Sequence, residues 1–254
     1  NGTTPSICSS VFATYELDTI VPTVTIDDSP GTTIGTCNFT ASATDTNSSG
    51  TQYMVTFSEP VDPTSLSPGS ISNNGSAAIG SWSTPLSCGD GLTYLIETMS
   101  VTTEGTIQPF FPIGAVSDFA GNTSAASTNN TTIVNYDTTS PSVPTITLPV
   151  DTNPSYISTP TIRITSTESG VGILYNDPSC ISEILRQNLS PMSVDLNPII
   201  PSDGTYNYYA ATEDLAGNIS SCAGPLTYTL DTIVPNIMGI TSNSTATQSK
   251  TWTW

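Results

Sequence analysis

Short runs in which apolar and polar residues alternate recur along the chain. Three of them are Tyr53–Phe57, Thr161–Thr165 and Tyr206–Ala210, each with apolar residues at every second position. Successive side chains of a β-strand point to opposite faces of the sheet, so such a run buries one face and exposes the other. The pattern therefore predicts many short, half-buried strands.

Turn-forming residues separate these runs. Pairs such as Asn74-Gly75, Asp90-Gly91 and Ser169-Gly170 are typical of tight turns. The chain holds 20 prolines and no stretch of sustained 3.6-residue periodicity, so helix is expected to be scarce. A short helical turn is expected only around Ile181–Arg186. The sequence thus predicts an all-β fold made of sandwiches.

Two motifs recur together and in the same order. The first, Asp-Thr-Ile-Val-Pro, stands at Asp18–Pro22 and Asp231–Pro235, with a degenerate copy at Asp137–Pro141; we call these the Asp-Thr motifs. The second, Asp-x-Ala-Gly-Asn, stands at Asp118–Asn122 and Asp214–Asn218; we call these the Ala-Gly-Asn loops. The Asp-Thr motifs are 137 − 18 = 119 and 231 − 137 = 94 residues apart. One β-sandwich fits each interval, so tandem domains are expected.

The repeats predict where the domains begin and end. One sandwich is expected over residues 18–136, with a middle part longer than that of its neighbour, and another over 137–230. Residues 1–17 resemble the stretch before Asp231, which predicts the last strand of a preceding module. Residues 231–254 are expected to be the opening strands of a following module. The chain is accordingly expected to be a segment of a longer protein.

The charge balance limits the partners of the chain. It has 21 acidic and 3 basic residues, a net charge of −18, and its bases Arg163, Arg186 and Lys250 are far apart in sequence. No basic patch can neutralise several phosphates, so nucleic acid and anionic membranes are poor partners. No apolar stretch approaches the ~18 residues that a membrane-spanning helix needs. The acidic excess favours solubility or binding of divalent cations.

The five cysteines predict disulfides. Cys8, Cys37, Cys88, Cys180 and Cys222 are widely spaced, form no Cys-x-x-Cys pair, and have no histidine to complete a zinc site. The simplest pairing stays within modules and joins Cys37 to Cys88 and Cys180 to Cys222. Cys8 is then expected to pair with an upstream cysteine outside this chain. Disulfides place the chain in an oxidising, extracellular setting. The alternative is five reduced, buried thiols.

Catalytic chemistry finds little support in the sequence. The absence of histidine excludes Ser-His-Asp and Cys-His catalysis, and the only lysine is Lys250. The adjacent carboxylates Asp27-Asp28 and Glu213-Asp214 would point to opposite faces of a strand. No glycine-rich phosphate loop follows a predicted strand. The chain is expected not to be an enzyme and to require no cofactor.

The recurring motifs resemble those of a known family of domains. The Asp-Thr motifs, together with Asp203-Gly204-Thr205-Tyr206 leading into the loop at Asp214–Asn218, resemble bacterial immunoglobulin-like (Big) domains. In the first module, Phe57–Asp62 followed by Asp118–Asn122 is a related pattern. These domains are tandem modules of large surface adhesins and fibrous cell-surface proteins. The resemblance implies tandem immunoglobulin-like β-sandwiches arranged as an elongated rod, at the cell surface or outside the cell.

The same resemblance implies a set of metal ligands. In several members of that family, calcium ions at the junctions stiffen the rod, and carboxylate oxygens suit this hard cation. By resemblance, the calcium ligands are expected among the aspartates of both motifs, with Glu59 and Glu168 as further candidates. The expected aspartates are Asp18, Asp118, Asp137, Asp214 and Asp231. The alternative is that these aspartates only cap backbone N–H groups of turns.

Four hypotheses for function follow, the fourth being an accessory module of a secreted hydrolase. The leading one is a non-catalytic extracellular fibre or adhesin stalk, whose modules are rigid spacers that contact neighbouring modules of the same longer chain. The second is a self-assembling extracellular filament or surface-layer subunit. The third is a carbohydrate-binding surface module using Trp82, although core packing of Trp82 is the simpler expectation. The ligand of an adhesin would be a host or prey surface or a glycan, and the sequence does not name it.

Overall fold

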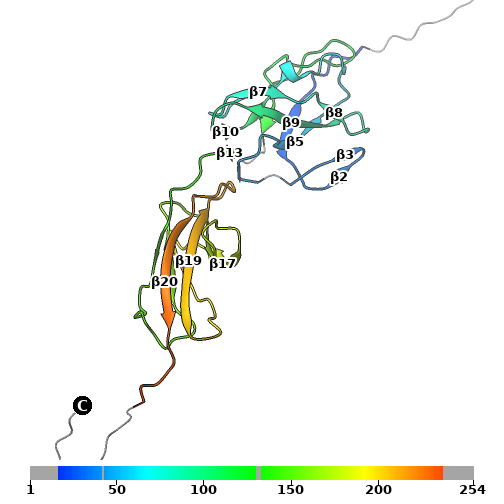
Figure 1. The fold of residues 1–254 in the computed structure, drawn as a ribbon. Helices are drawn as coiled ribbons and strands as arrows, with labels where there is room; N and C mark the ends of the chain where they lie inside the picture. The colour runs from blue at the N-terminus through cyan, green and yellow to red at the C-terminus, as the bar shows by residue number, and fades with distance from the viewer. Residues whose placement is uncertain (1–16, 42, 130–132, 237–254) are drawn as a thin grey trace, which may run out of the picture. The chain divides into compact units, whose positions relative to one another are not determined.

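The computed structural model describes residues 17–41, 43–129 and 133–236 (Figure 1). They form two compact units. The first contains residues up to Pro141 together with Glu213–Ile219, and the second contains Ser142–Thr212 and the residues from Ser220 onward. The described residues hold strands and a single 3-10 turn, η1 (Pro68–Ser70), and no α-helix. The all-β fold predicted from the alternating pattern is confirmed.

The described residues of the first unit form thirteen strands, most of them short. They are β1 (Val24–Asp28), β2 (Thr33–Ile34), β3 (Cys37–Asn38), β4 (Asp45–Thr46), β5 (Gln52–Phe57), β6 (Ser72–Asn73), β7 (Ile79–Trp82), β8 (Leu86–Ser87), β9 (Thr93–Val101), β10 (Gly105–Ile107), β11 (Pro109–Phe110), β12 (Thr128–Asn129) and β13 (Val134–Tyr136). The largest sheet has the order β12-β1-β5-β9-β7, with β8 also paired to β9. A second sheet has the order β10-β13-β4, and β11-β6 and β2-β3 are two-stranded.

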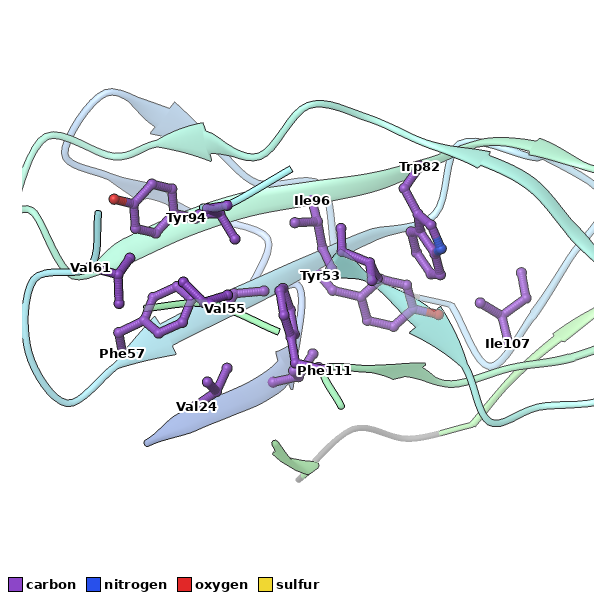
Figure 2. Packing of buried hydrophobic residues seen from close by; sticks show 14 of the residues in the cluster. Val24, Tyr53, Val55, Phe57, Val61, Trp82, Tyr94, Ile96, Ile107 and Phe111 are labelled. Carbon is purple, nitrogen blue, oxygen red and sulfur yellow. The ribbon is translucent and has the colours of Figure 1, made fainter. Parts of the chain in front are cut away.

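The core of the first unit lies on one face of the large sheet. Tyr53, Val55 and Phe57 of β5 are all buried, as their alternation predicts. Figure 2 shows the rings around Phe57, which makes edge-to-face contacts with Tyr94 and Phe111 at centroid distances of 5.6 and 6.2 Å. Such pairs add to the stabilisation that burial itself provides.

The opposite face of that sheet carries a smaller cluster. Met54 and Leu95 pack there against buried Phe39 and the disulfide that joins Cys37 to Cys88. Cys37 lies on β3, so the disulfide ties the β2–β3 hairpin to the segment that precedes β9. The hairpin covers apolar side chains that would otherwise face water.

The second unit is a sandwich of two sheets. Its strands are β14 (Thr145–Thr147), β15 (Ile162–Thr165), β16 (Val171–Tyr175), β17 (Glu183–Asn188), β18 (Ser193–Leu196), β19 (Gly204–Glu213) and β20 (Ala223–Leu230). The sheets have the orders β14-β15-β18 and β17-β16-β19-β20. Ile162 and Ile164 from the first sheet pack in one buried cluster with Leu174 and Tyr208 from the second. Two sheets packed around a shared core form a β-sandwich, as the alternating pattern predicts.

A disulfide also covers the outer face of the second unit. Cys180 and Cys222 are joined, and Cys180 packs with Ile173, Tyr175 and Ala211 in a cluster outside the main core. Among the described cysteines, each unit therefore holds one disulfide, and each disulfide lies on an outer face of a sheet. Cys8, whose partner was expected upstream, lies outside the described residues.

The expectation of a helical turn over Ile181–Arg186 is wrong. Residues Glu183–Asn188 form β17, which pairs antiparallel with β16. The register shifts so that Leu174 lies opposite Leu185 and Tyr175 opposite Glu183. Ile184 is the extra residue of this bulge, and both it and Leu185 are partly buried. A bulge thus places neighbouring apolar residues inward, which imitates helical spacing in the sequence.

The repeat boundaries at 18–136 and 137–230 stay a prediction, because a division by contacts does not define where a sequence repeat begins. The partial modules expected at 1–17 and 231–254 fall largely outside the described residues. A search of the described ranges for a helix long and apolar enough to cross a membrane finds none.

Candidate functional site

The three Asp-Thr motifs share one local geometry. The side-chain Oδ1 of Asp18 accepts a hydrogen bond from the N–H of the residue two positions further on, at 2.9 Å. Asp137 and Asp231 accept the corresponding bond at 2.9 and 3.0 Å. This is the turn that an aspartate forms with its own backbone, so the motif determines the direction in which the chain leaves each aspartate.

The Ala-Gly-Asn loop of the first unit is closed by its end residues. Asp118 accepts from the N–H of Asn122 at 2.8 Å and from its side-chain Nδ2 at 2.8 Å, and the Asp118 N–H donates to the Asn122 carbonyl at 3.0 Å. Burial disfavours the charged carboxylate, but the hydrogen bonds from Asn122 and from the backbone of Gly121 and Ala120 together lower the pKa of Asp118. Gly121 has φ +92°, a conformation in which glycine is strongly favoured.

The loop at Asp214–Asn218 repeats this geometry. Asp214 accepts from the N–H of Asn218 at 2.8 Å and from its side-chain Nδ2 at 2.9 Å, and the Asp214 N–H donates to the Asn218 carbonyl at 3.0 Å. Gly217 also has φ +92°. The five-residue motif therefore adopts the same loop conformation in both places, although Asn47 donates hydrogen bonds to Ala216 and Asn218 of the second loop alone.

Each loop also holds an Asp-Thr motif. The side-chain Nδ2 of Asn122 donates to the backbone carbonyl of Asp18 at 3.2 Å. In the same way, Asn218 donates to the carbonyl of Asp137 at 2.9 Å. In each case, one asparagine side chain donates both to the aspartate carboxylate of its own loop and to the backbone carbonyl of the aspartate that begins the Asp-Thr motif.

A third recurring element was missed by the sequence analysis. Glu104-Gly105-Thr106 and Asp203-Gly204-Thr205 both place an acidic residue before the strand that pairs with the last strand of the unit. We call these the acidic turns. The shared acid-Gly-Thr pattern could have revealed the first one.

The acidic turns bind the threonine of the Asp-Thr motif. Glu104 Oε1 accepts from the N–H of Thr138 at 2.9 Å and from its hydroxyl at 2.7 Å. Asp203 Oδ1 accepts the same two bonds from Thr232, at 3.0 and 2.8 Å. The bonds from Thr138 lower the pKa of Glu104.

A group of three carboxylates is the candidate cation site. Ligand oxygens of Asp18, Glu59 and Asp118 lie within 4.8 Å of one another. Glu59 Oε1 is buried and has no hydrogen-bond partner among the described residues. Desolvation, followed by the charges of Asp18 and Asp118, raises the pKa of Glu59. Oxygen ligands from three carboxylates and an orphaned buried oxygen fit a hard divalent cation such as calcium.

No basic residue of this region can neutralise the group. Residues 17–141 contain neither lysine nor arginine. The two described arginines lie in the second unit. Arg163 makes a bidentate pair with the carboxylate of Asp195, and the guanidinium nitrogen of Arg186 lies 3.8 Å from a carboxylate oxygen of Glu183. Among the described residues of the first unit, no basic side chain therefore relieves the repulsion within the three-carboxylate group, and a proton or a dissolved cation can do so.

The remaining predicted ligands are not gathered in this way. Asn218 bridges Asp214 and the Asp137 carbonyl, but no third acidic side chain joins them in the part of the chain that the structure describes. Asp231 accepts the N–H bond of its own turn, and Glu168 donates its N–H to Ser166. The structure brings together Asp18, Asp118 and the further candidate Glu59.

Trp82 packs in the core. Its side chain is only 8% exposed and lies edge-on to Tyr53, with ring centroids 6.4 Å apart (Figure 2). A sugar ring stacks on an exposed aromatic face, and Trp82 offers none. The hypothesis that Trp82 is a carbohydrate platform is therefore wrong, and the simpler expectation of core packing is confirmed.

Comparisons with known proteins give only distant likenesses. No known family profile matches the chain, and no curated protein matches it significantly. Among solved structures it is similar to the N-terminal part of the bacterial S-layer protein SbsC, at 15% identity and a TM-score of 0.30 over 84% of this chain and 44% of that one. Domains 1–6 of surface layer protein SbsC match at 14% identity and a TM-score of 0.29, over 79% of this chain and 34% of that one. The S-layer protein rSbsC(31-844) matches at 12% identity and a TM-score of 0.27, over 79% of this chain and 33% of that one.

The chain thus spans less than half the length of these structures. At TM-scores of 0.30 and below, these likenesses do not indicate what the chain does.

Proposed function

We propose that this chain is a non-catalytic structural segment of an extracellular or cell-surface protein, in which sandwich repeats serve as spacers. One observation carries the proposal: the acidic residues of the recurring motifs accept hydrogen bonds from backbone N–H groups that shape loops and linkers. Glu104, Asp118 and Asp214 are typical of these. Carboxylates engaged in this way set the direction of the chain, which is a structural role.

The composition supports an extracellular setting. Each unit holds one disulfide, and disulfides persist in oxidising compartments. The sequence contains no histidine, which removes the commonest catalytic base. The proposed repeats are 18–136 and 137–230, flanked by parts of further modules at 1–17 and 231–254. An adhesin stalk is the specific form of spacer that we propose.

We further propose that Asp18, Glu59 and Asp118 hold a calcium ion at the start of the first repeat. Support comes from the buried, unpartnered Oε1 of Glu59 and from the absence of lysine and arginine between residues 17 and 141. Bound calcium would supply positive charge to three carboxylates that otherwise repel one another. For Asp137, Asp214 and Asp231, calcium binding stays a prediction.

Two measurements test the spacer function. Small-angle X-ray scattering of the chain should give a maximum dimension near the summed lengths of two sandwiches. Antibodies against the folded chain should label intact cells of the source organism without permeabilisation. A scattering profile of a single compact globule, or labelling only after permeabilisation, would overturn the proposal.

A self-assembling filament or surface-layer subunit is the second candidate. One observation favours it: β17 is an outermost strand of six residues, and no described strand pairs with its outer edge. A free edge can accept a strand from another molecule. Sedimentation velocity over a wide concentration range tests this candidate. Growth of larger species with concentration would favour it, whereas a monomer at every concentration would exclude it.

A further inference from the structure

The middle Asp-Thr motif is held at three consecutive residues, Asp137, Thr138 and Thr139. The carbonyl of Asp137 accepts from Asn218 of an Ala-Gly-Asn loop at 2.9 Å. The next residue, Thr138, donates its N–H and its hydroxyl to Glu104 of an acidic turn, at 2.9 and 2.7 Å. The hydroxyl of Thr139 donates to the same carboxylate at 2.8 Å. A complete junction therefore consists of one motif, one loop and one acidic turn.

The first motif has only half of these contacts. Asn122 binds the carbonyl of Asp18 at 3.2 Å, which is the contact with the Ala-Gly-Asn loop. No acidic side chain of the described residues accepts a hydrogen bond from Thr19. Asp18 and Thr19 are exposed, whereas Asp137 is partly buried.

The last motif has only the other contact, the one with an acidic turn. Asp203 binds Thr232 at 3.0 and 2.8 Å, which is the contact with the acidic turn. Within the described ranges, no asparagine side chain donates to the carbonyl of Asp231, and this residue is also exposed. The two outer motifs thus show each half of the junction separately.

The first and last motifs have the same five residues, Asp-Thr-Ile-Val-Pro. Thr232 binds a carboxylate through its N–H and hydroxyl, and Thr19 follows an aspartate with the same turn geometry. A residue that presents two donors together is matched by a carboxylate placed as Glu104 and Asp203 are. The chemistry missing at Thr19 is therefore that of an acidic turn.

We propose that Thr19 is a binding site for the acidic turn of a preceding repeat, joined directly to Asp18 in the same way that residues 18–136 are joined to Asp137. The partner is thus another repeat of this kind whose Glu or Asp before a glycine accepts both bonds from Thr19. This inference rests on the proposed function, because it needs tandem repeats. It adds a specific rule: an acidic turn must come before each Asp-Thr motif.

An extended chain tests the inference. A second copy of residues 18–136 is inserted directly before Asp18 of the full chain, so that Tyr136 of the inserted copy precedes the original Asp18. Amide hydrogen exchange at the original Thr19 is then compared with the unextended chain, with Thr138 as an internal reference. We expect exchange at Thr19 to slow about tenfold and to approach that of Thr138.

Three variants of the inserted copy make the result specific. Glu104→Ala there should return Thr19 to its exchange rate in the unextended chain. Glu104→Asp should keep the protection, because Asp203 performs this role with the shorter side chain. Asp27→Ala, an acidic change outside any turn or motif, should leave it unchanged. If insertion leaves Thr19 exchange unchanged while Thr138 stays protected, or if Glu104→Ala has no effect, the inference is overturned.

Failure of the inference and failure of the proposed function are distinguishable. An unprotected Thr19 in a chain whose scattering shows two separate sandwiches removes the rule and leaves the spacer function standing. A compact globule in scattering removes the spacer function whatever Thr19 does.

Discussion

The hydroxyl of Tyr228 donates a hydrogen bond of 2.7 Å to the backbone carbonyl of Ile157, 71 residues earlier in the chain. Tyr228 is fully buried, so this bond satisfies a hydroxyl that water cannot reach. Tyr53 in the first unit is equally buried, but its hydroxyl has no partner among the described residues. Desolvation, followed by the charge of Asp28, raises the pKa of Tyr53.

Replacing Tyr53 by phenylalanine should stabilise the first unit. The substitution removes a buried polar group without a hydrogen bond, which costs roughly 1–3 kcal/mol while it is present. We expect the free energy of unfolding to rise by about 1 kcal/mol, measured by chemical denaturation.

Tyr228→Phe is the matched control and should lower the free energy of unfolding, whereas Tyr53→Phe should raise it. It removes a bond that is made, and it leaves the Ile157 carbonyl without this partner, so a loss of about 1 kcal/mol is expected. If both variants raised, or both lowered, the free energy of unfolding, the difference between the bonded hydroxyl of Tyr228 and the unpartnered hydroxyl of Tyr53 would be contradicted.

Calcium should stabilise the first unit. With an affinity of ~10⁻⁴ to 10⁻³ M, typical of extracellular modules, 10 mM calcium would add about 1.4–2.7 kcal/mol. Thermal melting in calcium and in chelator measures this. Glu59→Gln should weaken the calcium effect, whereas Asp27→Asn, outside the three-carboxylate group, should preserve it. Identical melting of the parent chain with calcium and with chelator would remove the site.

The pH dependence in chelator follows from Glu59. Its pKa is raised in the folded state, so the folded chain binds this proton more tightly than the unfolded chain does. The stabilisation is present at acid pH and is lost as pH rises through the folded pKa of Glu59. Glu59→Gln removes this contribution, and the difference between parent and variant melting temperatures across pH measures it. A parent-to-variant difference that does not change with pH would contradict this reasoning.

Each disulfide should stabilise its own unit. The two bridges span 51 and 42 residues, for which the chain-entropy relation gives about 4 kcal/mol each. We expect a loss of roughly 2–4 kcal/mol on replacing either cysteine pair by alanine. Replacing Cys37 and Cys88 should lower the unfolding transition of the first unit alone, and replacing Cys180 and Cys222 that of the second. Each variant is the control for the other, and hydrogen exchange resolves the two units.

The Ala-Gly-Asn loops should respond equally to the same substitution. Gly121 and Gly217 share φ +92°, and a Cβ at Gly121 would meet nothing within 4 Å, so Gly121→Ala measures backbone strain alone. We expect a cost of about 1–2 kcal/mol for each alanine variant. Gly69→Ala, where the backbone is not left-handed, should cost less. A clear difference between the two loop variants would show that surroundings, and not the motif, set the loop.

Much of the fold could be predicted because its signals are local. The alternation at Thr161–Thr165 identifies β15, and each Ala-Gly-Asn loop is closed by bonds between residues four apart in sequence. β17 could not be predicted, since its apolar spacing reflects a bulge that exists only when β16 lies beside it. The partner of Glu104 could not be predicted either, because Thr138 is 34 residues away, although the acid-Gly-Thr pattern that Glu104 shares with Asp203 is visible in the sequence.

The amino-acid sequence alone determined that this protein is all-β, that it repeats, and that its repeats share turns built by aspartate and glycine, because those features depend on neighbours along the chain. The tertiary structure alone decided which carboxylates meet. Asp18 and Asn122 are 104 residues apart in sequence, and Glu59 comes beside Asp18 and Asp118 only when the strands pair. Electrostatic repulsion and hydrogen bonding act over a few ångströms in space, so the packing of the sheets determines which of these residues interact.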